Sequence, residues 1–401
     1  MNLLKTTFGN LEFKSPLLIG SGQYTTSIGQ IGIHAGKIAA KEWGGIVTKS
    51  VIRKYGLQFK PHLWTSPEYR FFAMQNSGPA FSEFSSELLN DVKKDALSCR
   101  KAGIRLIVSI MGNSLAEWAE LAIAMEKAGA DALELNLSCP SPRETIKKSM
   151  GAMRIGQSPE KTFQVARAVK KAVNIPVWAK LTANYQDVPA VASSCKMAGL
   201  DAVSAINTIP GIIGIDIETG IPFSSDISGK SYLSGLSGPL IKPVALGIVA
   251  EISKNTDIPV CGIGGIVKWK DVLEFFYAGA GLVQICIGVM WYGFSLGEKI
   301  SVGVNQFLKR KKYISINDIK GKAINYLNSN IPNQYFKESK LLLDKQKCNG
   351  CGLCITACRD SAYQAISYTK NSMEINADLC QLCGLCMVVC KKGAISLVDL
   401  L

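Results

Sequence analysis

Eight of the thirteen cysteines lie between residues 348 and 390. They form two runs with the same spacing, C-x2-C-x2-C-x3-C, beginning at Cys348 and at Cys380. Thiolates are strong ligands for soft metals, and this spacing is typical of proteins that hold [4Fe-4S] clusters. Zinc is the alternative, because C-x2-C pairs also bind zinc, but eight cysteines at this tight spacing favour two clusters.

The repeated spacing also predicts which cysteines share a cluster. In two-cluster bacterial ferredoxins, the fourth cysteine of each run binds the cluster of the other run. We therefore predict one cluster held by Cys348, Cys351, Cys354 and Cys390, and a second held by Cys380, Cys383, Cys386 and Cys358. Arg359 and Lys391 follow the fourth cysteines, where proline is usual, but no ligand is lost.

A second set of reactive residue types follows short apolar runs in the first 290 residues. The set comprises Ser21, Lys49, Asn136, Ser138, Cys139, Lys180, Asn207 and Thr208. A lysine placed directly after a buried apolar run suits an anion or an electron-rich ring, and this holds for both lysines. The glycines at 262–265 and 286–288 would let the backbone approach a phosphate closely. Phosphate, lysines and asparagines together suit flavin mononucleotide (FMN).

The elements that must position these residues alternate in type. Helical stretches such as 114–130 and 158–173 separate short apolar runs with the continuous hydrophobicity of strands buried on both faces. Eight runs fit this description: 16–22, 44–50, 105–112, 132–139, 176–182, 202–208, 259–265 and 282–288. This alternation predicts an α/β protein with a (β/α)8 TIM barrel, whose catalytic groups lie at the carboxyl ends of the strands. An open doubly wound sheet is the alternative.

The composition shift predicts three parts. Residues 1–308 would form the FMN-binding, catalytic barrel, residues 309–338 a linker with a short helix at 316–329, and residues 339–401 a small α+β ferredoxin-like domain with two [4Fe-4S] clusters. A GxGxxG fingerprint in a suitable strand–helix setting is absent from the sequence, so we expect NAD(H) to act only through a partner.

Composition argues against other classes of protein. The formal charge is +14, but the basic runs are short, so we expect no nucleic acid partner. The first residues carry charges and no apolar core of a signal peptide, which predicts a cytoplasmic protein with reduced thiols. Residues 277–297 carry no formal charge, but six glycines and Gln284 favour a buried strand and loop over a membrane span.

These residues resemble a known family. The segment ALELNLSCP (132–140), with 48–50, 76–78, 179–181 and 207–208, resembles the dihydroorotate dehydrogenase-like flavoproteins. The stretches 318–327 and 348–366 resemble the C-terminal part of dihydropyrimidine dehydrogenases. The nearest type is the FMN- and iron–sulfur-bearing large subunit of the bacterial NAD-dependent enzymes.

The resemblance implies roles for individual residues. The residues expected to line FMN are Gly20, Ser21, Lys49, Lys180, Gly235, Gly264, Gly265, Cys286 and Ile287. The residues expected to bind the substrate are Asn76, Asn136, Ser138, Asn207 and Thr208. Cys139 would be the general acid/base.

The implied reaction is reversible reduction of the C5=C6 bond of uracil or thymine to the 5,6-dihydropyrimidine. Electrons would arrive through the [4Fe-4S] clusters from an FAD/NAD-binding partner subunit or a ferredoxin. We therefore expect a hetero-oligomer that acts on a small pyrimidine-like molecule.

Three departures leave other substrates open. Gly78 stands near a position where pyrimidine-reducing relatives carry Glu. Ser141 stands where those enzymes usually carry His and dihydroorotate dehydrogenases carry Asn, and the loop 141–154 differs in composition. A dihydroorotate dehydrogenase-type or other enone reductase on the same scaffold is therefore one alternative. A non-catalytic electron-transfer subunit is a second, against which the retained cysteine, lysines and asparagines argue.

Overall fold

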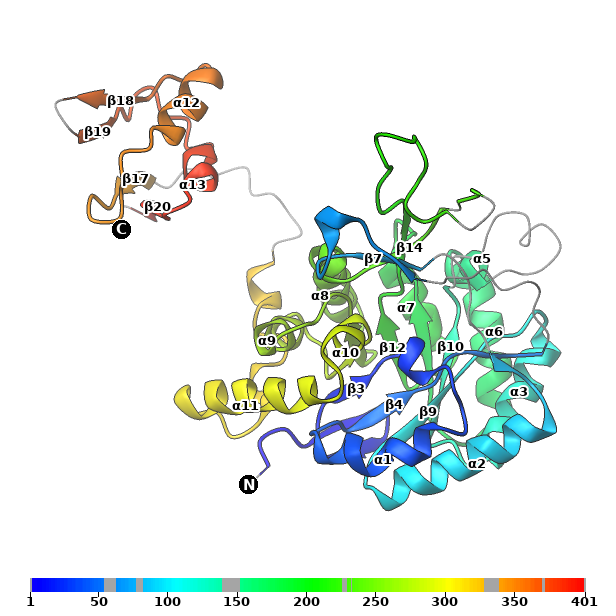
Figure 1. The fold of residues 1–401 in the computed structure, drawn as a ribbon. Coiled ribbons are helices and arrows are strands. Elements are labelled where there is room, and N and C mark those ends of the chain that lie inside the picture. The colour runs from blue at the N-terminus through cyan, green and yellow to red at the C-terminus, as the bar shows by residue number, and fades with distance from the viewer. Residues whose placement is uncertain are drawn as a thin grey trace. The chain divides into compact units, whose positions relative to one another are not determined.

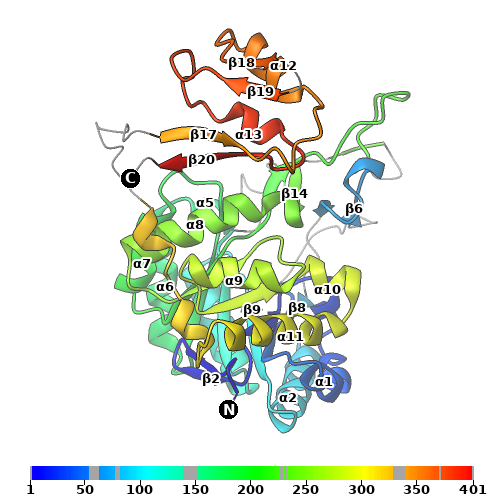
Figure 2. The same ribbon diagram turned by 90° about the vertical axis from the view of Figure 1, so that its left-hand side faces the viewer.

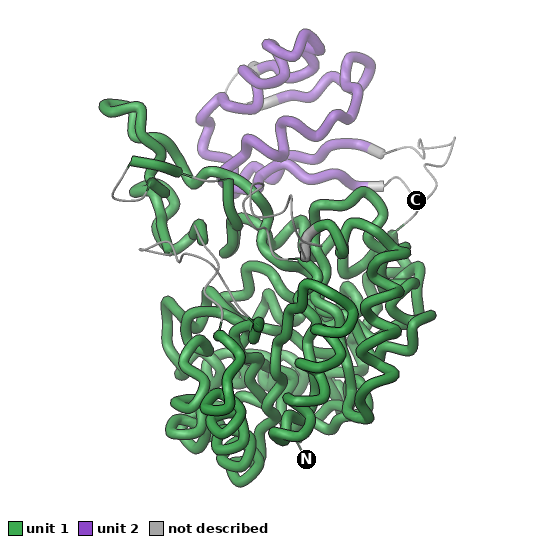
Figure 3. Tube along the Cα trace, turned by 90° about the vertical axis from the view of Figure 1, so that its right-hand side faces the viewer, with its two compact units in different colours: residues 1–327 green, residues 328–401 purple. Residues whose placement is uncertain are grey.

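The computed structural model describes residues 2–53, 63–76, 82–138, 152–225, 229–231, 233–327, 339–369 and 372–399. Residues 1–327 form one compact unit and residues 328–401 a second (Figure 3). Each unit is described by itself.

The first unit is a closed barrel of eight parallel strands surrounded by helices (Figure 1). The strands are β3 (Leu17–Ile19), β4 (Gly45–Val47), β9 (Arg105–Ile110), β10 (Ala132–Asn136), β11 (Val177–Leu181), β12 (Ala202–Ala205), β15 (Val260–Ile263) and β16 (Leu282–Ile285). Each pairs with the next in this order, and β16 pairs with β3. All eight apolar runs contain one strand, so the TIM barrel is confirmed and the open sheet is wrong.

The helices that follow these strands bury one face each against the barrel. They include α1 (Ile31–Ala40), α2 (Ser86–Lys101), α3 (Leu115–Lys127), α6 (Pro159–Ala172), α7 (Val188–Met197), α8 (Lys242–Asn255), α9 (Trp269–Tyr277) and α11 (Ser295–Arg310). Ser114 and Ser158 cap α3 and α6, because each hydroxyl accepts a backbone N–H of the first turn at 3.2 Å. Both predicted helices are therefore present.

A hairpin closes the amino-terminal end of the barrel. Its strands are β1 (Thr6–Phe8) and β2 (Leu11–Phe13). Phe8 and Phe13 are buried against Trp178, and the rings of Phe8 and Trp178 meet edge to face with centroids 5.2 Å apart. Figure 2 shows β2 and β14 at opposite ends of the barrel. The interior of the barrel is therefore filled at this end, which leaves the carboxyl ends of the strands for a site.

A small antiparallel sheet lies at that other end. Its order is β13 (Ile209–Gly211), β14 (Ser234–Ser237), β7 (Met74–Asn76) and β6 (Leu63–Trp64). Two further short strands, β5 (Val51–Ile52) and β8 (Ser82–Glu83), continue from β9. The sequence patterns did not predict this sheet, because its strands are too short to show an alternation of apolar and polar residues.

The segment after α11 differs from the single short helix expected at 316–329. It holds two separate 3-10 turns, η4 (Ile316–Ile319) and η5 (Ile324–Tyr326). Between them Gly321 has a φ of +73°, and its N–H donates to the carbonyl of Phe276 at 2.9 Å. A backbone amide that bonds to the end of α9 cannot extend a helix of its own, which explains the break.

The uncharged stretch 277–297 contains β16, whose four residues are buried, and the short α10 (Ile287–Tyr292). In the described part of the chain, helices of the length and apolarity that crossing a membrane requires are not found.

The second unit repeats one small motif. Strand β17 (Ser339–Leu343) pairs antiparallel with β20 (Ile395–Asp399), and β18 (Ile366–Thr369) pairs with β19 (Ser372–Ile375). Helices α12 (Leu353–Asp360) and α13 (Leu385–Val389) each follow a left-handed glycine, Gly352 and Gly384. Among the described residues, its cluster of buried apolar side chains is small and comprises Ile366, Cys386 and Ile395, and Ala365 and Ala394 are buried as well.

Candidate active site and cluster sites

Two asparagines predicted to bind substrate meet at the mouth of the barrel. Asn136 ends β10, and Asn207 follows β12. The amide of Asn207 donates to the Ser138 hydroxyl at 2.9 Å and to the Asn136 side-chain oxygen at 3.4 Å. Because amides carry both donors and acceptors, this pair can recognise a ring with N–H and C=O groups without adding charge.

Two serines extend this network, and neither was among the predicted site residues. The Asn136 amide donates to the hydroxyl of Ser50 at 2.9 Å, and Ser50 shares a 2.8 Å hydrogen bond with Ser109. Both serines are buried at the ends of neighbouring strand runs. Ser50 follows Lys49 directly, so its place after an apolar run was the available signal.

The small antiparallel sheet brings Asn76 to the same end of the barrel. Asn76 on β7 pairs in register with Gly235 on β14. A Cβ on Gly235 would lie 2.1 Å from the hydroxyl oxygen of Thr208, so only glycine fits beside that side chain. Asn76, Gly235 and Thr208, which lie far apart in the chain, are therefore neighbours, although Gly235 was predicted to line the cofactor and the other two the substrate.

The two lysines act on one thiol. Burial raises the pKa of the Cys286 thiol, and the positive charges of Lys49 and Lys180 oppose that shift. The Cys286 thiol also donates to the backbone carbonyl of Ser21 at 3.4 Å. Lys49, Lys180, Ser21 and Cys286 were all predicted to line FMN, and the structure places them around a common point.

Glycines near this point keep the backbone close to Cys286. A Cβ on Gly20 would meet the Cβ atoms of Gln284 and Cys286 at 3.3 and 3.4 Å. A Cβ on Gly22 would lie 2.3 Å from the Cys286 sulfur. The loop after β3 therefore passes so close to the end of β16 that a side chain at position 22 would collide with Cys286, whereas one at position 20 would be a tight fit.

The loops after β15 and β16 carry the residues that were predicted to hold the phosphate. Gly265 has a φ of +69°, and a Cβ there would lie 2.7 Å from the carbonyl oxygen of Gly238. Its neighbour Gly264 has a φ of +143°. Ile287 begins α10, and the first N–H groups of a helix lack intrahelical partners. Because β15 and β16 are paired, these two loops are adjacent and could share one phosphate.

Three observations show that the residues present fit FMN. The glycine-rich loops leave room where a side chain would collide, and two lysines face the same point as described above. In addition, the side-chain oxygen of Gln284 is buried without a hydrogen-bond partner among the described residues. This oxygen is an acceptor next to Gly20, and a ring N–H of a flavin would satisfy it.

A charged group inside the barrel was not predicted at all. Glu134, in the middle of β10, is buried beside Lys180, and Ser204 and Gln284 surround its carboxylate. A glutamate within an apolar strand run is an unusual residue at a buried position, and this was the signal that could have identified it.

The predicted general acid, Cys139, lies outside the described residues, as do Gly78, Ser141 and most of the loop 141–154. Ser138, the residue before Cys139, is buried and bonded to Asn207.

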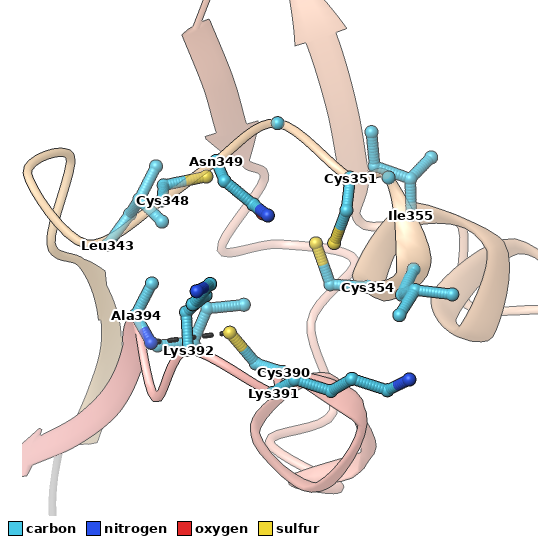
Figure 4. Close-up of a pocket in the computed structure, with 14 residues that line it drawn as sticks. Leu343, Cys348, Asn349, Cys351, Cys354, Ile355, Cys390, Lys391, Lys392 and Ala394 are labelled. Atoms are coloured by element: carbon cyan, nitrogen blue, oxygen red, sulfur yellow. Dashed lines mark hydrogen bonds between the residues drawn. The ribbon is translucent and has the colours of Figure 1, made fainter.

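In the second unit, four predicted ligands surround one cavity (Figure 4). Cys348, Cys351, Cys354 and Cys390 all line a cavity of about 240 Å³. The other predicted set, Cys358, Cys380, Cys383 and Cys386, lines a second, smaller cavity. Cysteines from both runs therefore converge on each site, in the crossed arrangement that the spacing predicts.

Backbone amides donate hydrogen bonds to the sulfurs of both cysteines that cross between the runs. The N–H groups of Ala394 and Ala365 donate to the sulfurs of Cys390 and Cys358, each at 3.2 Å. The hydrogen bond from Ala394, with other backbone amides nearby, lowers the pKa of Cys390. Burial has the opposite effect on Cys354 and Cys386, whose pKa values are raised. A bound iron–sulfur cluster would offset that desolvation, because the metal binds thiolate.

No disulfide bond joins any two of the twelve cysteines in the described part of the chain. The cysteines that line the two cavities of the second unit are therefore not joined to one another by disulfide bonds.

Comparison with known proteins supports both the barrel and the cysteine-rich unit. Residues 3–308 match the family model described as dihydroorotate dehydrogenase, and residues 342–397 match the 4Fe-4S dicluster domain. The chain is 32% identical, over 92% of its length and 88% of the relative, to the NAD-dependent dihydropyrimidine dehydrogenase subunit PreA of Escherichia coli. It is 38% identical, over 80% of its length and 99% of the relative, to the catalytic subunit of dihydroorotate dehydrogenase B (NAD(+)) of Pyrococcus abyssi. The corresponding subunit of Methanocaldococcus jannaschii is 35% identical over 80% of the chain.

Proposed function

We propose a pyrimidine-reducing activity for this chain, which belongs to the dihydroorotate dehydrogenase family and carries a C-terminal 4Fe-4S dicluster domain. This family binds FMN, and the dicluster domain indicates iron–sulfur clusters. The chain is thus a flavin and iron–sulfur oxidoreductase of the dihydroorotate dehydrogenase and PreA type. The proposed reaction is reversible reduction of the C5=C6 bond of uracil or thymine.

The observation that carries this proposal is the coverage of the relatives. The dihydropyrimidine dehydrogenase subunit matches 92% of the chain, which includes part of the cysteine-rich unit. The match to the catalytic subunits of dihydroorotate dehydrogenase B covers only 80% of the chain, although it covers almost all of those subunits. The organisation of barrel and dicluster domain in one chain therefore favours the pyrimidine-reducing type.

The polar network at the barrel mouth suits this substrate. Asn136 and Asn207 are held by Ser50 and Ser138, so their amide groups are fixed before a ligand binds. Pre-organised donors and acceptors lose little conformational entropy on binding and fix the orientation of a pyrimidine ring. Asn76 and Thr208 would complete the contacts to the ring edges.

In the proposed reaction, FMN, when bound, supplies the hydride to one carbon of the double bond. Cys139 would deliver the proton to C5 from the opposite face of the ring. Lys49 and Lys180 would stabilise negative charge on the cofactor, and the backbone of Gly264, Gly265 and Ile287 would hold its phosphate.

We further propose that the electrons enter through the two clusters from an FAD- and NAD-binding partner subunit or a ferredoxin. The relative from E. coli is named as a subunit of an NAD-dependent enzyme. Such an assembly would work in the cytoplasm, where thiol ligands stay reduced. The proposed parts are a barrel of residues 1–308, a linker of residues 309–338 and a cluster-bearing domain of residues 339–401.

The test uses anaerobically purified, reconstituted full-length protein that has been chemically reduced. Uracil, thymine, orotate and a simple enone are added separately, and the return of the oxidised flavin absorbance is followed. Fast reoxidation by uracil or thymine and slow reoxidation by orotate is the expected result. Reoxidation by orotate or the enone alone would reject the proposed substrate.

Dihydroorotate oxidation is the second candidate, because the barrel is more similar in sequence to the archaeal dihydroorotate dehydrogenase B subunits, at 38% identity, than the chain is to the pyrimidine-reducing relative, at 32%. The same experiment with orotate as acceptor decides between the two.

A further inference from the structure

One carboxylate and one ammonium share the interior of the barrel. Glu134 on β10 and Lys180 on β11 form an ion pair with Oε1 and Nζ 3.8 Å apart. Their side chains are only 1% and 9% exposed. Either charge alone would carry a large desolvation cost in such a place, and pairing offsets part of it.

The carboxylate is held from two further strands. Its other oxygen, Oε2, accepts hydrogen bonds from the Ser204 hydroxyl at 2.7 Å and from the Gln284 amide at 2.6 Å. These donors come from β12 and β16, so the carboxylate is anchored across the barrel. The anchoring leaves Oε1 directed to Lys180.

The ion pair leaves the donors of Lys180 available. A separation of 3.8 Å is too long for a hydrogen bond, and the described residues give Lys180 none. An ammonium has three N–H donors. The charge of Lys180 also acts on the Cys286 thiol, which lies by the loop predicted to line FMN. The charge of Lys180 therefore acts both on the Glu134 carboxylate and on a residue predicted to line the cofactor.

The strand register places the two residues at different depths. Lys180 pairs with Asn136, two residues beyond Glu134 toward the carboxyl end of β10. Lys180 is thus nearer the mouth of the barrel than Glu134. Because Coulomb interactions weaken with distance, the ammonium acts on a ligand at the mouth more strongly than the carboxylate does.

We propose that Glu134 is a positioning residue that fixes the ammonium of Lys180 for the flavin and thereby sets the flavin reduction potential, with Ser204 and Gln284 holding the carboxylate. This inference rests on the proposed binding of FMN. A fixed ammonium stabilises the electron-rich reduced ring relative to the oxidised ring without reorganisation.

The sign of the change in flavin potential distinguishes this positioning role of Glu134 from a direct electrostatic effect of its carboxylate. If Glu134 acted on the flavin only through its own negative charge, removing that charge would raise the potential. If it acts by fixing Lys180, removing the carboxylate lowers the potential, because the ammonium loses its fixed position. The direct effect would persist without Lys180, whereas the positioning effect would not.

The experiment measures the flavin midpoint potential of the reconstituted full-length protein by anaerobic spectroelectrochemical titration. The variants are Glu134→Gln, Lys180→Met and the double variant. We expect each single substitution to lower the preference for reduced over oxidised FMN about tenfold relative to the wild type. For a two-electron couple, this is a fall of about 30 mV in the midpoint potential. The double variant should match Lys180→Met. Binding of oxidised FMN to the deflavinated protein is measured alongside.

Asp201→Asn is the matched control, because Asp201 also pairs with a lysine, Lys170, at 2.6 Å but lies at the amino-terminal end of β12. It should leave the potential unchanged. A raised or unchanged potential in Glu134→Gln would overturn the proposal, and so would a further shift in the double variant.

If Glu134→Gln does not fold, Ser204→Ala removes one of the two hydrogen bonds that hold the carboxylate. It should lower the potential by a smaller amount, and only where Lys180 is present; a rise or no change rejects the proposal. The titration contains no substrate, so failure to reduce uracil leaves this result intact. Wild-type protein without bound FMN would instead refute the proposed cofactor.

Discussion

The two units assemble their reactive side chains in different ways. In residues 1–327, the side chains at the barrel mouth come from strands spread over most of the unit, such as Lys49, Asn136 and Gln284. In residues 328–401, the eight cysteines come from two short stretches, 348–358 and 380–390. The first site therefore depends on barrel closure, and the second on local spacing.

The two units also differ in the size of their buried apolar cores. The barrel has a continuous buried cluster between strands and helices and a second cluster in its interior. In the second unit, five buried apolar residues are described, and three of them form its cluster. A unit with so little apolar burial requires another source of stability, and metal ligation supplies it in small domains of this kind.

Removing iron is expected to have the largest effect, and the two units should respond to it differently. A chelator under anaerobic conditions should unfold the second unit, because its core is too small alone, while the barrel stays folded. Hydrogen–deuterium exchange would show lost protection in residues 339–399 and retained protection in β9 and β10. Reconstitution with iron and sulfide should restore protection; persistent protection without iron would reject the contrast.

Replacing Cys139 by Ala tests the barrel chemistry. Turnover should fall by about 10²–10⁴-fold, the usual contribution of a general acid, while chemical reduction of the flavin is unchanged. Stopped-flow kinetics with the reduced protein measures this.

Cys195→Ala is the control for that variant. Cys195 is buried in α7, and burial raises its pKa to about 12, so its thiol is inert. Its loss should leave turnover unchanged. Turnover of Cys139→Ala at the wild-type rate would remove that residue from the mechanism.

Phe8→Ala tests how far the barrel is stable through its own packing. Phe8 is 3% exposed and lies against Trp178, so the substitution should lower the free energy of unfolding of the first unit by about 3–5 kcal/mol. Denaturant titration of tryptophan fluorescence gives the value. The half-buried Leu11 of the same hairpin provides the control, since Leu11→Ala should cost less. Equal losses, or a simultaneous loss of cluster absorbance, would contradict independent stability of the units.

Ser50→Ala should give the smallest effect. It removes the hydroxyl that accepts the Asn136 amide at 2.9 Å, so KM should rise about fivefold, equivalent to about 1 kcal/mol, with kcat little changed. Steady-state kinetics with the accepted pyrimidine measures it. Ser194, a buried serine of α7 with one hydroxyl bond at 2.7 Å, is the matched control. An unchanged KM in Ser50→Ala would mean that Asn136 needs no support.

Features with a local cause were predictable from the sequence. Continuous apolar runs gave all eight barrel strands, because a strand buried on both faces needs apolar residues at every position. Ser114 and Ser158 identified two helix starts, because a cap acts only on the next turn. The cysteine spacing predicted the two groups that line the cavities of the second unit.

Features with long-range causes needed the tertiary structure. The pairing of Asn76 with Gly235 depends on strands of three and four residues, whose patterns are too short to detect. The position of Glu134 beside Lys180 depends on the stagger between β10 and β11, which barrel closure sets. By itself, the sequence determined the strands, the helix starts and the grouping of the cysteines, because each follows from neighbours along the chain. Only the closed barrel decided which polar side chains meet, because those contacts join residues whose separation in sequence carries no periodic signal.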